Sequence, residues 1–333
     1  MESNLKCFFL KGKYRASDDF LVLILLIFGG LRYFFYYLCR KMQKWAVSWP
    51  DRLNSFQATG MPFLQNKVLF IAQEITPYLP ESEIANICRN LPQGIQDRGH
   101  EIRTFMPKYG SINERRNQLH EVIRLSGMNL IIDDTDHPLI IKVASIQSAR
   151  MQVYFIDNDD YFQRNADGVV DEDMRPDNDE RSIFFVRGVM ETVKKLRWTP
   201  DIIHCHGWIT ALTPLYIKKS YAEDPSFRDA KVIYSLYDNG FKTPFDPNFA
   251  AKLKLEGIQD TDIPFAVGES IDPVVLNKLA IQYSDGVIQA SRDINSEITD
   301  YVQKTGIPFL GYQDPENYID AYNDFYNKIV GNE

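Results

Sequence analysis

From Lys67 onward, short apolar runs alternate along the chain with longer segments in which apolar residues recur at helical spacing. The run Lys67–Ala72 (KVLFIA) is typical of a strand buried in a parallel sheet. Residues 83–98 place their apolar side chains on one helical face, and Gly99 follows as a helix stop. Residues 100–107 are the next predicted strand, so this stretch predicts one right-handed βαβ unit.

The same alternation continues toward the end of the chain. The predicted helices are 179–196, 208–219, 272–283, 292–304 and 315–330, and the further strands are 202–206, 231–238 and 285–291. Pro214 lies inside the second of these helices, where a kink is expected. Between residues 119 and 156, weakly alternating runs predict antiparallel hairpins. We therefore expect an α/β protein with a doubly wound, mainly parallel sheet and extra β-hairpins.

Ligands of such sheets bind beyond the carboxyl ends of the strands. The four loops expected at this rim begin at Gln73, Pro107, His206 and Asp238. His204 and His206 are two residues apart on a predicted strand and therefore point to the same face. His206 is nearer the rim and is the better candidate for binding, while a buried, hydrogen-bonded histidine is the alternative interpretation.

The strand 231–238 ends in Tyr237 and Asp238, which Asn239 and Gly240 follow. Asp-Asn-Gly is first of all a turn signal, although the oxygens of Tyr237 and Asp238 can also contact a sugar. The loop 73–80 has no glycine, and the chain contains no dinucleotide fingerprint, P-loop or nucleophile elbow. The residues by themselves thus support an α/β domain with an open rim and no phosphate site.

Composition narrows the class of protein. The 333-residue chain is 44% apolar and 25% charged, as in ordinary globular proteins, and its net charge of -8 disfavours nucleic-acid binding. Its four cysteines fit no zinc or disulfide spacing, so a cytoplasmic protein with reduced thiols is expected. The Asp-rich loop 158–179 shows no ligand spacing, and a solvated loop is favoured over a cation site. No metal and no cofactor are expected.

Residues 1–60 differ from the rest and are expected to form an N-terminal extension before a domain at 61–333. Within the extension, residues 20–39 are strongly apolar apart from Arg32, and basic residues lie on both sides. Three interpretations stay open: a membrane anchor, an interfacial segment, or residues absent from the mature protein because translation begins at Met42 or Met61.

Five segments, in order, resemble the N-terminal catalytic, Rossmann-like domain of bacterial glycogen and starch synthases, which are GT-B glycosyltransferases. They are 67–78 (KVLFIAQEITPY), 91–110, 177–208, 231–241 and 276–298, within a resemblance that covers about 67–312. The resemblance implies glucosyl transfer from a nucleotide sugar, usually ADP-glucose, to an α-1,4-glucan. It also implies a second Rossmann-like domain that supplies most of the donor contacts, and we expect that half to be missing because the chain stops at Glu333.

Three departures fall where the family carries out its chemistry. The family's Lys-x-Gly-Gly-Leu loop is replaced by residues 80–84 (PESEI), which removes the cation and the glycines near the donor phosphates. Gly207 stands for the aspartate of the His-x-His-Asp-Trp segment, and Tyr237 stands for the functional histidine of Thr-Ile-His-Asn. No residue is therefore assigned a catalytic role, and we expect the chain to be catalytically impaired on its own.

The resemblance and the rim together suggest a set of substrate-binding residues. They are His206, Trp208, Tyr237, Asp238, Tyr78 and Tyr109. Aromatic faces suit stacking on sugar rings, while burial in the core is the alternative for each aromatic residue. Three functions remain in view: a degenerate synthase domain that binds an α-glucan, a nucleotide sugar or a partner; a working half that a partner chain completes; and a non-enzymatic interaction module, membrane-associated through 20–39.

Overall fold

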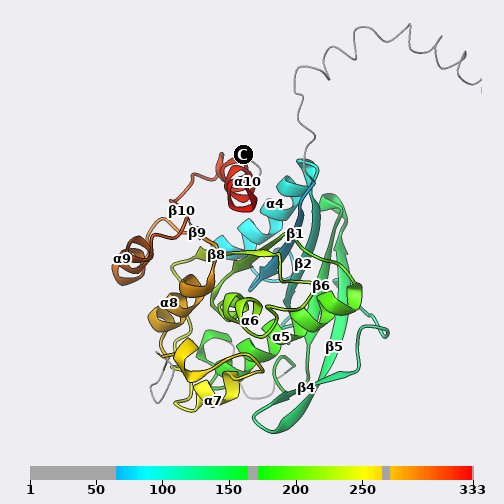
Figure 1. The fold of residues 1–333 in the computed structure, drawn as a ribbon. Coiled ribbons are helices and arrows are strands. Elements are labelled where there is room, and N and C mark those ends of the chain that lie inside the picture. The colour runs from blue at the N-terminus through cyan, green and yellow to red at the C-terminus, as the bar shows by residue number, and fades with distance from the viewer. Residues whose placement is uncertain (1–64, 164–171, 265–270, 332–333) are drawn as a thin grey trace, which may run out of the picture. The chain divides into compact units, whose positions relative to one another are not determined.

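The computed structural model describes residues 65–163, 172–264 and 271–331 (Figure 1). The predicted extension 1–60, with its apolar segment 20–39, lies outside these ranges, as does the middle of the acidic loop 158–179. In the part of the chain that is described, no helix is both long and apolar enough to cross a membrane.

The described strands form one mixed, ten-stranded sheet. They are β1 (Lys67–Ala72), β2 (Glu101–Pro107), β3 (His120–Glu121), β4 (Met128–Ile132), β5 (Thr135–Ile146), β6 (Met151–Asp157), β7 (Ile202–His206), β8 (Lys231–Leu236), β9 (Gly286–Gln289) and β10 (Phe309–Leu310). Their order is β10-β9-β8-β7-β1-β2-β6-β5-β3, and β4 pairs with β5. The strands from β10 to β6 are parallel, whereas β5 runs antiparallel to β3, β4 and β6.

Helices lie on both faces of the parallel part of the sheet (Figure 1). The α-helices are α4 (Glu83–Asp97), α5 (Asn178–Leu196), α6 (Thr213–Lys218), α7 (Phe249–Leu253), α8 (Pro273–Tyr283), α9 (Ser296–Thr305) and α10 (Tyr318–Val330); the short 3-10 helices are η1 (Gln147–Ala149), η2 (Glu172–Met174), η3 (Trp208–Thr210) and η4 (Asp260–Asp262). On one face, Val68 and Phe70 of β1 pack in a core cluster with residues of α4 and α10. Leu69 and Ile71 belong to the larger cluster on the other face, as the alternation of strand side chains requires.

This architecture confirms the predicted doubly wound α/β fold with extra hairpins. The predicted kink at Pro214 is wrong, because the expected helix 208–219 is two elements, η3 and α6. Pro214 lies in the first turn of α6, where a proline costs no helical hydrogen bond. The short helix α7 and the edge strand β10 were not predicted, since each has too few residues to show a period.

The strand order places the predicted rim as expected. Strands β8, β7, β1 and β2 are parallel neighbours, so the loops that follow them leave the sheet at one edge. β1 and β7 are parallel neighbours at the centre of the sheet, where the strand order switches from one side of β1 to the other. There the backbone N–H of Gln73 donates to the carbonyl of His206 at 3.0 Å. This is the switch point at which open α/β sheets bind ligands.

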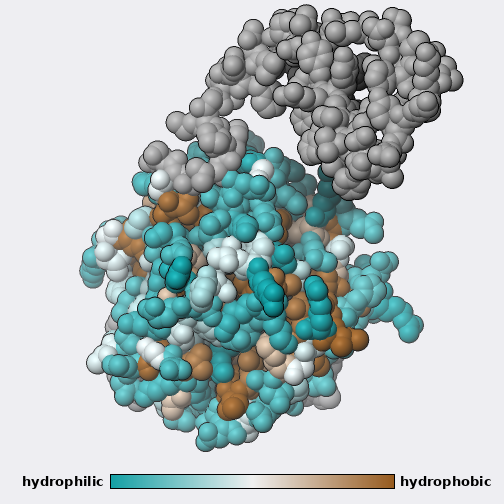
Figure 2. Space-filling model, turned by 45° about the vertical axis from the view of Figure 1, so that its right-hand side comes forward, coloured by the Kyte–Doolittle hydropathy of each residue, from teal (hydrophilic) through white to brown (hydrophobic). Residues whose placement is uncertain are grey.

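Hydrophilic residues dominate the face of the molecule that Figure 2 shows, and hydrophobic residues appear there as small, separate patches. The exposed large hydrophobic side chains of the described residues are Ile123, Ile131, Met174 and Phe309. Single exposed apolar side chains of this kind are normal on a globular protein and do not mark a site.

Candidate functional site

The two predicted histidines meet beneath the rim, but both are fully buried. Their ring centroids are 3.9 Å apart. Nδ1 of His204 is hydrogen-bonded to the hydroxyl of Tyr326 on α10 at 2.6 Å, and its Nε2 to the hydroxyl of Ser235 at 2.7 Å. Burial, with a smaller effect from neighbouring His206, lowers the pKa of His204 well below its usual value. His204 thus fits the interpretation of a buried, satisfied histidine.

His206 has one satisfied ring nitrogen and one that is not. Its Nδ1 lies 2.8 Å from the hydroxyl of Tyr237, while Nε2 is buried and has no hydrogen-bond partner within the described structure. Burial lowers the pKa of His206 to about 3, so the ring is neutral near pH 7. No group of three or more side chains suited to hold a metal occurs in the described ranges.

Tyr237, which the resemblance places at the family's functional histidine, is itself buried. Burial raises the pKa of its phenol well above the ordinary value, so the group keeps its proton near neutral pH. A group that exchanges protons during catalysis needs a pKa near the working pH. Tyr237 and His206 thus form a buried hydrogen bond between two groups that are neutral near pH 7.

Gly207, which stands for the family's aspartate, has φ 88° and ψ 161°. This region of backbone conformation is open essentially to glycine alone. A Cβ added at Gly207 would lie 2.5 Å from Oε1 and 2.7 Å from Cβ of Gln73, which is buried at the end of β1. Any side chain at position 207, an aspartate included, would therefore strain the backbone and meet Gln73.

The segment 80–84 caps helix α4 with the chain's own groups. The hydroxyl of Ser82 accepts a hydrogen bond from the backbone N–H of Ala85 at 3.0 Å and donates one to the carboxylate of Glu74 at 2.6 Å. Glu83 lies in the first turn, and its carboxylate accepts a hydrogen bond from the hydroxyl of Ser291. Two carboxylates thus lie at the positive end of α4, the end of a helix that generally attracts anions.

The other predicted aromatic residues are also buried: Trp208 is 2%, Tyr109 3% and Tyr78 8% exposed. The indole N–H of Trp208 donates to the carboxylate of Asp173 at 2.8 Å. Tyr78 packs edge-on against Phe155, with ring centroids 4.9 Å apart. Their ring faces lie mainly against the protein itself.

Asp238 is the exposed member of the predicted set. Its backbone N–H donates to the hydroxyl of Ser291 at 3.0 Å, and the same hydroxyl donates to Glu83. Ser291 therefore ties the end of β8 to the start of α4. This leaves the side-chain carboxylate of Asp238 facing solvent at the rim.

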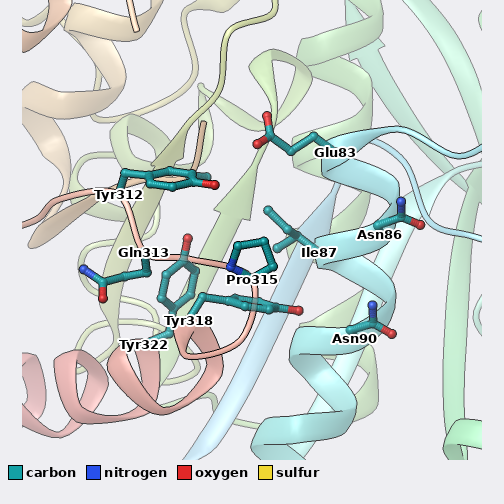
Figure 3. Close-up of a pocket in the computed structure, with 10 residues that line it drawn as sticks. Glu83, Asn86, Ile87, Asn90, Tyr312, Gln313, Pro315, Tyr318 and Tyr322 are labelled. Carbon is teal, nitrogen blue, oxygen red and sulfur yellow. The ribbon is translucent and has the colours of Figure 1, made fainter. Parts of the chain in front are cut away.

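The sequence interpretation missed a cavity of about 310 Å3 beside this bridge (Figure 3). It is lined by Glu83, Asn86, Ile87, Asn90, Ala290, Tyr312, Gln313, Pro315, Tyr318 and Tyr322. One wall comes from α4 and the other from residues 312–322 near the end of the chain. The available signal was the run of tyrosines before and within α10, but helical spacing alone does not separate cavity walls from core.

A mainly parallel sheet with helices on both faces and a rim at the switch point is the architecture of a Rossmann-like domain. Residues 67–308 match the family model for the starch synthase catalytic domain, and the chain belongs to this family.

Curated relatives are glycogen synthases. The chain is 38% identical over 177 residues to that of Chlorobium phaeobacteroides, covering 52% of this chain and 36% of the relative. It is 34% identical over 239 residues to that of Chlorobium phaeovibrioides, covering 70% of this chain and 47% of the relative. The chain thus spans less than half the length of these two relatives.

Among solved structures, the fold is similar to the catalytic domain of starch synthase IV from Arabidopsis thaliana bound to ADP and acarbose. The TM-score is 0.61 at 20% sequence identity, and the match covers 75% of this chain and 52% of the other. At this identity, the likeness supports the fold class.

Proposed function

We propose that this glycogen/starch synthase-type domain binds an α-glucan and does not transfer glucose on its own. The observation that carries the proposal is the N-terminus of α4, where Pro80, Ser82 and Glu83 stand for the family's lysine and two glycines. The carboxylate of Glu74, which bonds to Ser82, and that of Glu83 both lie there. Each close pair of carboxylate and phosphate costs about 1 kcal/mol or more even with solvent screening. The diphosphate of ADP-glucose is therefore repelled from this position.

Two further features support impaired transfer. Gly207 carries no carboxylate, and its backbone conformation excludes one. Tyr237 offers a phenol whose pKa is raised by burial, in place of a histidine. The site thus has neither the charge nor the proton-exchanging group that the family resemblance implies.

In this proposal, the predicted substrate-binding residues have two roles. Asp238 is exposed at the rim and contacts the glucan directly. His206, Tyr237, Trp208, Tyr78 and Tyr109 form the floor beneath the rim and hold its loops in place. Cys88 and Cys205 are free and buried, which is compatible with a cytoplasmic location.

Calorimetric titration of the full 333-residue chain tests the proposal. We expect binding of maltoheptaose and no binding of ADP-glucose at millimolar concentration, together with no incorporation of labelled glucose into glycogen. ADP-glucose binding tighter than millimolar, or transfer by the chain alone, contradicts the proposal.

The same assay separates an impaired domain from a working half. Because the chain spans 36% of the glycogen synthase of Chlorobium phaeobacteroides, the C-terminal half of that relative is a suitable donor-binding partner to add. We expect no transfer after this addition, because the α4 terminus still repels the diphosphate. Restored transfer would show that this chain supplies a competent acceptor half.

A further inference from the structure

The cavity between α4 and residues 312–322 has the size of a small-molecule site. Its volume is about 310 Å3, at the lower end of the range of about 300–1,000 Å3 that such sites occupy. Figure 3 shows Tyr312, Gln313, Pro315, Tyr318 and Tyr322 on one side and Glu83 and Ile87 of α4 on the other. The cavity is therefore bounded by two segments that are distant in the sequence.

The lining combines aromatic rings with neutral hydrogen-bonding groups. Tyr312 and Tyr318 are half-buried, and Tyr318 packs edge-on against the buried Tyr322 at 5.6 Å between ring centroids. The side-chain amides of Asn86, Asn90 and Gln313 also line this cavity. Aromatic faces suit the C–H faces of a sugar ring, and amides can both donate to and accept from hydroxyls.

The charge of the lining argues against a phosphorylated ligand. None of the ten lining residues is cationic, and Glu83 contributes a carboxylate. The guanidinium of Arg292, which lies 5.2 Å from the ring centroid of Tyr312, is paired with Asp314. The carboxylate accepts one hydrogen bond from Ser291, which leaves capacity to accept from a ligand hydroxyl. A neutral polyol therefore fits this cavity better than a nucleotide does.

We propose that this cavity binds a glucosyl unit of an α-glucan through Tyr312 and Tyr318. The inference rests on the proposed function and gives it a location. Residues 312–322 lie beyond residue 308, where the match to the starch synthase catalytic domain ends, so the match does not include this wall.

The cavity is connected to the exposed part of the rim. Ser291 joins the carboxylate of Glu83, in the cavity wall, to the backbone of Asp238. A glucan whose one unit sits in the cavity has its next units directed past Ser291 toward Asp238. The cavity and Asp238 then bind the same glucan chain.

Titration of maltoheptaose into variants of the full chain tests the cavity. Tyr312→Ala removes a ring that lies on a loop, and we expect binding about tenfold weaker. Tyr312→Phe keeps the ring and should stay within about twofold of wild type. Asn90→Ala, at an exposed position of α4, should weaken binding about fivefold. Tyr301→Ala on α9, a half-buried tyrosine outside the lining, is the matched control and should bind as wild type does.

The outcomes separate the two proposals. Maltoheptaose binding that is unchanged in both Tyr312→Ala and Asn90→Ala overturns the cavity assignment and leaves glucan binding by the domain intact. Absence of binding by the wild-type chain overturns both. Adenosine serves as a second probe because bases also stack on aromatic rings, and adenosine binding that Tyr312→Ala abolishes would overturn the saccharide assignment.

Discussion

The buried floor beneath the rim, taken together with the neighbouring His204, contrasts with the open cavity between α4 and residues 312–322. The floor lies within the family match and contains the residues to which the sequence points first. Its rings are buried and bonded to one another or to neighbouring hydroxyls. The cavity has a wall beyond the match and an unfilled volume of about 310 Å3. A family motif thus locates the edge of the sheet, whereas local packing decides where a ligand can enter.

Helix α10 contributes residues both to the buried histidine site and to the cavity. Tyr326 of α10 bonds to His204 and helps to seal the floor, while Tyr318 and Tyr322 of the same helix line the cavity. The packing that closes the histidine site therefore also creates the new one. Variants that act on one region and spare the other sharpen this comparison.

The largest effect is expected from Gly207→Asp, which restores the family's residue to the floor. The positive φ and the clash with Gln73 should lower the free energy of unfolding by about 3 kcal/mol. Urea denaturation measures the change, and Gly207→Ala, which has the same strain without the charge, is the control. A variant as stable as wild type, or one that binds ADP-glucose, would show that the floor can accept the aspartate.

The second-largest effect is expected from acidification, which should lower the stability of the protein through His206. The pKa of His206 is lowered by burial to about 3, below the ordinary 6.5, so the unfolded chain binds more protons between these values. The stability that neutral His206 contributes is present above pH 6.5 and is lost as the pH falls toward 3. We expect His206 to contribute a loss of about 2 kcal/mol from pH 7 to pH 5, to which the buried His204 adds, and urea denaturation measures the sum. His206→Phe should show a smaller pH dependence, and an equal dependence would contradict this assignment.

Gly94→Ala tests how closely α4 and α10 must approach. An added Cβ would lie 2.6 Å from Cγ2 of Ile319 on α10, so the helices must move apart. We expect a loss of about 1.5 kcal/mol of stability, with weaker maltoheptaose binding because the cavity walls separate. The double variant Gly94→Ala/Ile319→Ala removes the clash and should recover binding. If neither stability nor maltoheptaose binding changes, the side chain of Ile319 can move aside without a loss of free energy, and the helices need not move apart.

The smallest effect is expected from Tyr237→Phe, which removes the hydroxyl bonded to Nδ1 of His206 at 2.8 Å. The buried nitrogen loses its partner, and stability should fall by about 1 kcal/mol. Maltoheptaose affinity should not change, since Tyr237 does not line the cavity. Loss of affinity without loss of stability would place the sugar at the floor instead.

Local signals explain why much of the fold could be predicted. The bounds of β1 match the apolar run KVLFIA, and α4 begins after its capping residue Ser82 and ends just before Gly99. The position of the rim could also be predicted, because the carboxyl ends of neighbouring parallel strands lie at the same edge of a sheet. Pro214 was misinterpreted because a proline in a helical pattern can begin a helix as well as bend one.

The site could be predicted only in part, because its properties depend on distant segments. His204 and Tyr326 are 122 residues apart, and Glu83 and Ser291 are 208 apart. The sequence brought the histidines together through their shared strand, but it gave no sign that α10 would cover them. The cavity has one wall from each end of the described domain, and no local pattern links those walls.

The capping of α4 also bears on how such a domain can change over generations. Replacing Glu74 leaves the hydroxyl of Ser82 without its acceptor, and replacing Ser82 removes the cap that holds Ala85. Gly207→Asp strains the backbone before it offers any charge to a ligand. Each of these replacements is expected to lower stability by itself. If the proposed function is correct, the capping of α4 and the backbone at Gly207 oppose a return of the family's residues one at a time.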